Sequence, residues 1–72
     1  STRYSTTINI ASGVQSFTIT HNLGYLRPNV TVIDEVSDRE IMVTPIYTST
    51  SQLSLPITSS QAFTGARVEV YI

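Results

Sequence analysis

Apolar and polar residues alternate along most of this chain with a period of two. The clearest case is the stretch 66–72, where Val68, Val70 and Ile72 share the side that we expect to face inward. This period is typical of strands with one buried face, and the Thr, Val, Ile, Tyr and Phe residues that fill the runs favour strands. The pattern therefore predicts an all-β protein.

Short turns separate the alternating runs, which span residues 4–10, 14–20, 29–36, 40–47, 52–57 and 66–72. Gly13 closes the first turn, and Ser37, Asp38 and Arg39 are expected to join the third and fourth runs as a hairpin. A polar loop is expected at 58–64. Because no helical crossover stands between the runs, we expect a small antiparallel β-sandwich or Greek-key barrel of about six strands.

The run at 40–47 is apolar on both sides. One side carries Ile41, Val43 and Tyr47, and the other carries Met42 and Ile46. We expect one side to face the core and the other to form an interface. Pro45 cannot donate a ladder hydrogen bond, so the later part of this run should be an edge strand or a bulge.

Length and composition narrow the function further. A chain of 72 residues without cysteine is one small domain that no disulfide stabilises, so we expect oligomerisation to add stability. Charged residues make up 12% of the chain and the net charge is -1, which argues against nucleic acid and anionic membranes as partners. No apolar run approaches the roughly 18 residues of a membrane helix.

His21 is the only histidine of the chain and ends an alternating run just before Asn22, Leu23 and Gly24. Asn and Gly tolerate positive φ, and a histidine in this position can fix a turn by a hydrogen bond. We interpret His21, Asn22 and Gly24 as turn-forming residues. The two alternatives are a catalytic base and a metal ligand on the symmetry axis of an oligomer.

Four of the five carboxylates crowd into residues 34–40. A solvated hairpin tip explains this cluster, and weak calcium binding is the alternative. The chain offers no second histidine, no cysteine and no glycine-rich phosphate loop. We therefore expect no enzyme activity, no catalytic residues, no cofactor and no metal site, which leaves a small hydrolase as the least favoured hypothesis.

Tyrosines are the candidate contact residues, because a tyrosine combines a rigid apolar ring with a polar tip and is enriched in interfaces. Tyr25, Tyr47 and Tyr71 are the possible surface contacts, and Tyr25 is the one most expected to be exposed. Aromatic rings of this kind also stack on sugars. The alternative is that these rings cover sheet edges or subunit contacts.

The segment Phe17-Thr18-Ile19-Thr20-His21-Asn22-Leu23-Gly24 is followed by the strand Val30-Thr31-Val32, the acidic hairpin and a closing Gly65-x-x-Val68-x-Val70. Over residues 14–72 this pattern resembles small β-rich modules of bacteriophage tail fibres, tailspikes and baseplate appendages. The stretch Tyr25-Leu26-Arg27-Pro28 departs from it, because related modules often carry a shorter polar link there, so loop contacts cannot be transferred.

The resemblance implies a domain over residues 1–72, often C-terminal, of a longer fibre or spike protein in the extracellular virion. It implies a homotrimer that acts as a connector, a tip or a host-attachment head beside other appendage proteins. The leading hypothesis is therefore a non-enzymatic structural and adhesion module. The alternative is a carbohydrate-binding module that recognises a host cell-surface polysaccharide through Tyr25 and Tyr47.

Overall fold

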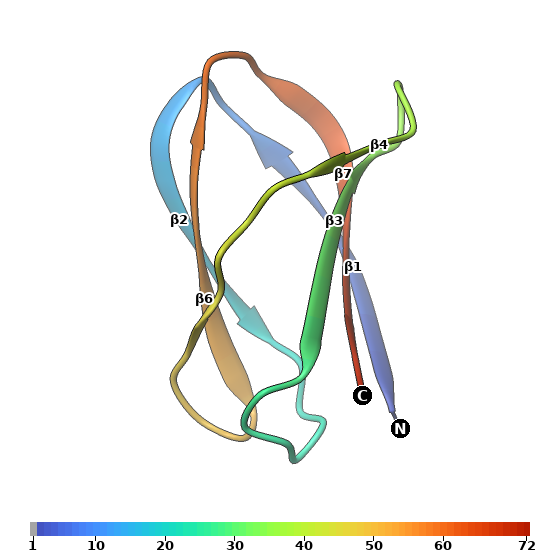
Figure 1. Ribbon diagram of the computed structural model, residues 1–72, viewed down its shortest axis with the longest axis vertical. Coiled ribbons are helices and arrows are strands. Elements are labelled where there is room, and N and C mark those ends of the chain that lie inside the picture. Colours follow the sequence, from blue (N-terminus) through green and yellow to red (C-terminus); the bar gives the residue numbers. More distant parts are fainter. Residues whose placement is uncertain (1) are drawn as a thin grey trace.

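The computed structural model describes residues 2–72, and all regular structure in that range is β-strand (Figure 1). Seven strands form two antiparallel sheets, sheet A in the order β1-β7-β3-β4 and sheet B in the order β2-β6-β5. The strands are β1 (Arg3–Ile10), β2 (Gly13–Thr20), β3 (Asn29–Asp34), β4 (Arg39–Ile41), β5 (Ile46–Tyr47), β6 (Gln52–Ser59) and β7 (Phe63–Tyr71). The predicted all-β sandwich is confirmed, with seven strands instead of about six.

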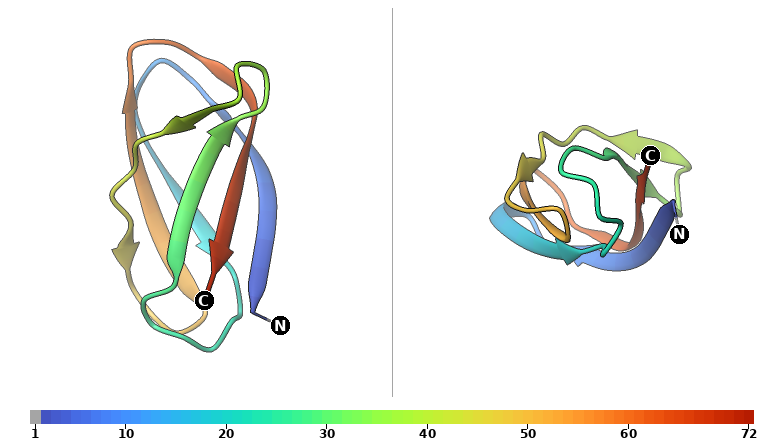
Figure 2. Two further views of the ribbon diagram at one scale, coloured as in Figure 1. Left: turned by 45° about the vertical axis from the view of Figure 1, so that its right-hand side comes forward. Right: turned by 90° about the horizontal axis from the view of Figure 1, so that it is seen from below.

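Two long arms of the chain build most of the sandwich. β1 continues into β2, and β6 continues into β7, so each arm passes from one sheet to the other at the same end of the molecule (Figures 1 and 2). The arms pair along their length: Ser5 lies opposite Glu69 in sheet A, and Phe17 lies opposite Leu55 in sheet B. Thr2 and Ile72 lie together at the opposite end of the molecule, where the Ile72 N–H donates to the Thr2 carbonyl at 3.1 Å.

A third segment crosses between the sheets within the predicted run 40–47. Ile41 lies opposite Val32 in sheet A, whereas Tyr47 lies opposite Leu53 in sheet B. Residues 42–45 between them belong to no strand. The prediction of one continuous strand was therefore wrong. The chain divides into β4 and β5 because its two ends hydrogen-bond to different sheets, and Pro45, which has no N–H, lies in the break.

One side of this crossing segment faces the core and the other faces away from it, as the alternation predicts. Ile41, Val43 and Tyr47 pack against the core. Met42 is 87% exposed and Ile46 is 55% exposed, which leaves two large apolar side chains in contact with solvent.

Among residues 2–72, nine apolar side chains are buried between the sheets. Burial of a side chain the size of Val or Leu contributes about 1.5–3 kcal/mol by removing it from water. The nine residues are Ile10, Ile19, Val32, Leu53, Leu55, Ile57, Ala66, Val68 and Val70. The central strands β6 and β7 supply six of them. On the edge strands β1 and β2, the inward-facing Tyr4, Ile8 and Phe17 are only half-buried. The core is therefore covered less completely along the β1–β2 arm.

The predicted polar loop at 58–64 is shorter in the structure, because β6 continues to Ser59 and β7 begins at Phe63. Ile8 lies opposite Ala66 while Ile10 lies opposite Phe63, so β7 accommodates one extra residue as a bulge.

The expectation that Ile72 points into the core was wrong. Ile72 lies beyond the end of β7 and is 54% exposed.

Candidate functional site

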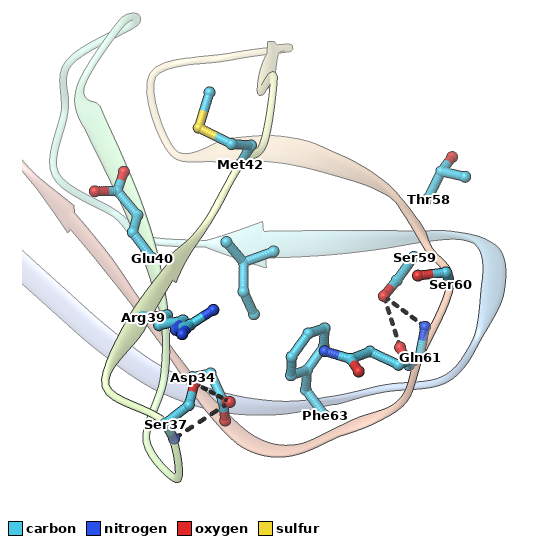
Figure 3. Close-up of a pocket in the computed structure, with 11 residues that line it drawn as sticks. Asp34, Ser37, Arg39, Glu40, Met42, Thr58, Ser59, Ser60, Gln61 and Phe63 are labelled. Carbon is cyan, nitrogen blue, oxygen red and sulfur yellow. Dashed lines mark hydrogen bonds between the residues drawn. The ribbon is translucent and has the colours of Figure 1, made fainter.

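An open groove of about 550 Å³ lies between β4 and the connection from β6 to β7 (Figure 3). Arg39 and Phe63 point into it from opposite sides, as Figure 3 shows. Both apolar and hydrogen-bonding side chains line the groove. Met42 is one of the apolar residues, and Asp34, Glu40 and Gln61 supply carboxylate and amide groups. An aromatic ring beside amide, hydroxyl and carboxylate groups can accept a polar ligand that also has an apolar face.

Asp34 is buried at the base of the β3–β4 turn, and its carboxylate is occupied by that turn. It accepts hydrogen bonds from Ser37 Oγ at 2.6 Å, from Val36 N at 3.2 Å and from Ser37 N at 3.4 Å. The Ser37 hydroxyl, followed by the two backbone amides, lowers the pKa of Asp34 below its ordinary value against the opposing effect of burial. Asp34 therefore stays ionised and organises the turn.

The remaining hairpin carboxylates are solvent-exposed. Glu35 and Asp38 lie in the turn at residues 35–38, which begins where β3 ends at Asp34, two residues earlier than expected. Glu40 lies in β4. Within residues 2–72, no group of three or more Asp, Glu, His or Cys side chains is arranged to hold a metal ion.

His21, Asn22 and Gly24 lie together in the segment that follows β2. His21 is buried, and its Nδ1 accepts a hydrogen bond from Leu23 N at 3.1 Å. Asn22 and Gly24 have φ values of 55° and 72°, a conformation that asparagine and glycine adopt more readily than other residues. His21 N and Asn22 N both donate to the Ser51 carbonyl, at 2.8 and 3.1 Å, which ties the turn to the start of β6.

The three candidate contact tyrosines lie in different environments. Tyr25 is 50% exposed in the loop before β3. Tyr47 is half-buried, packs against the core and donates its hydroxyl to the Pro28 carbonyl at 3.0 Å, so only part of the residue is open to the expected surface contact. Tyr71 is half-buried on the outer face of sheet A, with its hydroxyl 3.3 Å from Thr31 Oγ1.

Charged residues form a connected row on the outer face of sheet A. Glu69 pairs with Arg3 and with Arg67, and Arg67 also pairs with Glu35 at 3.1 Å. The Arg3 guanidinium lies over the ring of Tyr71, 5.1 Å from its centroid. Exposed pairs of this kind contribute about 0–1 kcal/mol each. Their alternating signs leave this face without a strong field.

The outward side of sheet B carries no charge, and we call it the sheet B face. Its side chains come from alternate positions of β2, β5 and β6: Val14, Ser16, Thr18, Thr20, Ile46, Gln52, Ser54, Pro56 and Thr58. Val14 is 84% exposed. Gln52 Nε2 donates to Thr20 Oγ1 at 3.1 Å, so part of this hydroxyl-rich surface is ordered by its own hydrogen bonds.

Sequence reasoning missed both the groove and the segregation of charge between the sheets. The groove is built by residues 34–42 and 58–63, which only long-range pairing brings together. The segregation had a signal, because residues 4–26 and 42–66 contain no Asp, Glu, Lys or Arg.

Comparison with known proteins gives no relative for this chain: no family model, no curated protein and no solved structure matches it. Residues 2–72 include no helical segment that could span a lipid bilayer.

Proposed function

We propose that this chain is a non-enzymatic structural and adhesion module of a bacteriophage tail appendage, which assembles with copies of itself and contributes to host-surface attachment. The resemblance described above supports the place in a virion appendage. The observation that carries the assembly role is the uncharged sheet B face, on which Val14 and Ile46 are largely exposed.

Two further features support assembly. Exposed apolar side chains beside an uncharged polar surface favour contact with another protein, because covering them removes apolar area from water without desolvating a charge. The domain is also small, lacks disulfides and covers its core incompletely along β1 and β2, so a partner surface adds burial that the single chain lacks.

Light scattering on a sizing column tests the assembly role. We expect a mass that is a multiple of the 7.9 kDa of one chain, and three copies would match the homotrimer that the resemblance implies. A single-chain mass at every concentration would overturn self-assembly.

Binding of the labelled domain to host cells tests attachment, with cells stripped of surface polysaccharide as the control.

Carbohydrate binding is the second candidate function, and the groove favours it. Phe63 offers a ring that can stack on a sugar, while Gln61 and Glu40 can hydrogen-bond to its hydroxyls. In an NMR titration with purified host polysaccharide, we expect chemical-shift changes at groove residues that Gln61→Ala reduces and that Thr18→Ala, on the sheet B face, leaves unchanged. Shifts centred on Tyr25 would place the sugar at the loop before β3 instead.

A further inference from the structure

We propose that the free edge of β2 binds β2 of a second copy of this chain, so that two copies of sheet B join into one continuous antiparallel sheet. This inference rests on the self-assembly proposed above and names the surface that carries it. It assigns the contact to backbone groups at the edge of one strand, and it joins the sheet B faces of the two copies into one continuous surface.

The hydrogen-bonding directions of β2 show which groups are available. Within residues 2–72, β2 has one neighbouring strand, β6, and the pair keeps a continuous register from Gly13 to Thr20. His21 continues this register opposite Ser51, and its N–H donates to the Ser51 carbonyl at 2.8 Å. Because bonded and non-bonded pairs alternate in antiparallel sheets, the odd-numbered residues of β2 bond to β6. The backbone N–H and C=O groups that point to the free edge are those of Val14, Ser16, Thr18 and Thr20.

This edge lacks the features that usually prevent edge-to-edge pairing, namely charge, proline, a bulge or short length. β2 has eight residues and contains no charged residue and no proline. The opposite edges are protected: β4 has three residues and carries Arg39 and Glu40, and β5 has two residues and follows Pro45. β1 carries a charged residue, Arg3, which is ion-paired on the outer face of sheet A.

A second copy of the same strand fits this edge. Antiparallel pairing of β2 with itself keeps the alternation of the two faces, so Ser and Thr side chains continue the sheet B face while Phe17 and Ile19 stay on the inner side. The half-buried ring of Phe17 would gain cover from the inner side of the partner strand. Two copies also meet here without like-charge repulsion, because sheet B contains no charged residue.

The symmetry of this contact makes a distinct prediction. A strand that pairs with its own copy forms a two-fold interface, which joins chains in pairs. A closed ring of three requires two different surfaces on each chain. The β2 contact therefore predicts a mass of two chains for the isolated domain, whereas a mass of three chains would come from another surface.

Proline substitutions at two edge positions, one in each sheet, provide matched variants. Thr18→Pro removes a backbone donor that points to the free edge of β2. In β1, the Ile72-to-Thr2 bond continues the pairing with β7, so alternation directs Ser5 N–H to the free edge of sheet A. Ser5→Pro is thus the equivalent change on the other sheet. Proline is tolerated at such edge positions because no internal hydrogen bond is lost.

The experiment combines light scattering of the wild type and both variants with amide hydrogen exchange of the wild type at a low and a high protein concentration. We expect a two-chain mass for the wild type and Ser5→Pro and a one-chain mass for Thr18→Pro. We also expect the amides of Ser16 and Thr18 to gain protection at the high concentration while that of Ser5 does not. The exchange measurement decides the question if Thr18→Pro fails to fold.

Each other outcome has a defined meaning. A folded Thr18→Pro variant that keeps the wild-type mass, a mass of three chains, or β2 amides that stay unprotected in the associated state would overturn the β2 contact and leave self-assembly standing. A one-chain mass for the wild type at every concentration would overturn both.

Discussion

At the scale of single residues, His21 combines burial with the use of only one ring nitrogen. Nδ1 accepts a hydrogen bond from the Leu23 N–H, which places the ring proton on Nε2. Nε2 has no hydrogen-bond partner among residues 2–72. Burial lowers the pKa of His21, because desolvation penalises the charged ring. Protonation would also place a hydrogen on Nδ1 that faces the Leu23 N–H. The turn therefore requires the neutral imidazole.

This arrangement predicts that the protein loses stability as the pH falls below neutrality. The folded pKa of His21 lies below the unfolded value of 6.5, so its stabilising contribution is complete above 6.5 and is lost as the pH falls through the folded pKa. Urea denaturation should show a lower free energy of unfolding at about pH 5.5 than at about pH 7.5. His21→Asn should show a smaller decrease, because the asparagine oxygen can accept the Leu23 amide without titrating. Equal decreases in both proteins would contradict this account.

A second residue-scale prediction concerns Asp34. Ser37→Ala removes the hydroxyl that contributes most to the lowered pKa of Asp34, so the pKa should rise. Because the folded pKa is depressed, the stabilising contribution of Asp34 is present above the unfolded pKa and is lost as the pH falls through the folded one. The variant should therefore lose it at a higher pH than the wild type. NMR titration of the Asp34 carboxyl carbon measures the change, and Ser60→Ala, in the same groove, should have no effect.

At the scale of the elements, the bulge in β7 depends on Gly65. Its φ is 75°, and its N–H donates to Asn9 Oδ1 at 3.0 Å across the β1–β7 pair. A methyl group on Gly65 would have Thr7 Cγ2 as its nearest neighbour, at 4.0 Å, so space is available and the cost of a side chain comes from the backbone. We predict that Gly65→Ala lowers the free energy of unfolding by about 1–2 kcal/mol. Urea denaturation measures this change, and a loss as small as that of Thr64→Ala would show that the bulge relaxes without strain.

The elements also show what the alternation can and cannot predict. It correctly places Val68 and Val70 on the inward side of β7 and separates the two sides of the crossing segment, because burial of one face leaves a period of two in the sequence. It cannot tell that Ile41 and Tyr47 belong to different sheets, since a strand that changes sheet alternates like one that does not. The turn after β2 could be read from Asn22 and Gly24, whose positive φ is a local property.

The candidate surfaces were harder to predict for the same reason. The acidic hairpin is visible in the sequence, but the groove beside it depends on the β6–β7 connection, some twenty residues further along the chain. Tyr25 could be expected at the surface from its loop position. The alternation groups Tyr47 with Ile41 and Val43, and the pairing of Tyr47 with Leu53 in sheet B shows that this side of the run is the buried one.

At the scale of the whole molecule, the two sheets differ in charge. Sheet A and its β3–β4 turn hold all the carboxylates and all the arginines except Arg27, which lies in the loop before β3. The outer face of sheet A satisfies its charges internally through Glu69, Arg3 and Arg67. Sheet B leaves a neutral face and a neutral edge. The molecule therefore has one side suited to water and one suited to a neutral protein surface.

This division predicts that the proposed self-association depends little on salt. Ionic screening weakens contacts between exposed charges, but it does not weaken backbone hydrogen bonds or apolar burial at an uncharged surface. Sedimentation equilibrium should give a dimer dissociation constant that changes by less than about threefold between about 0.05 and 0.5 M sodium chloride. Arg67→Gln, which removes a charge from the outer face of sheet A, should leave the constant unchanged. A strong weakening by salt, together with weaker association of Arg67→Gln, would move the contact from sheet B to the charged face of sheet A.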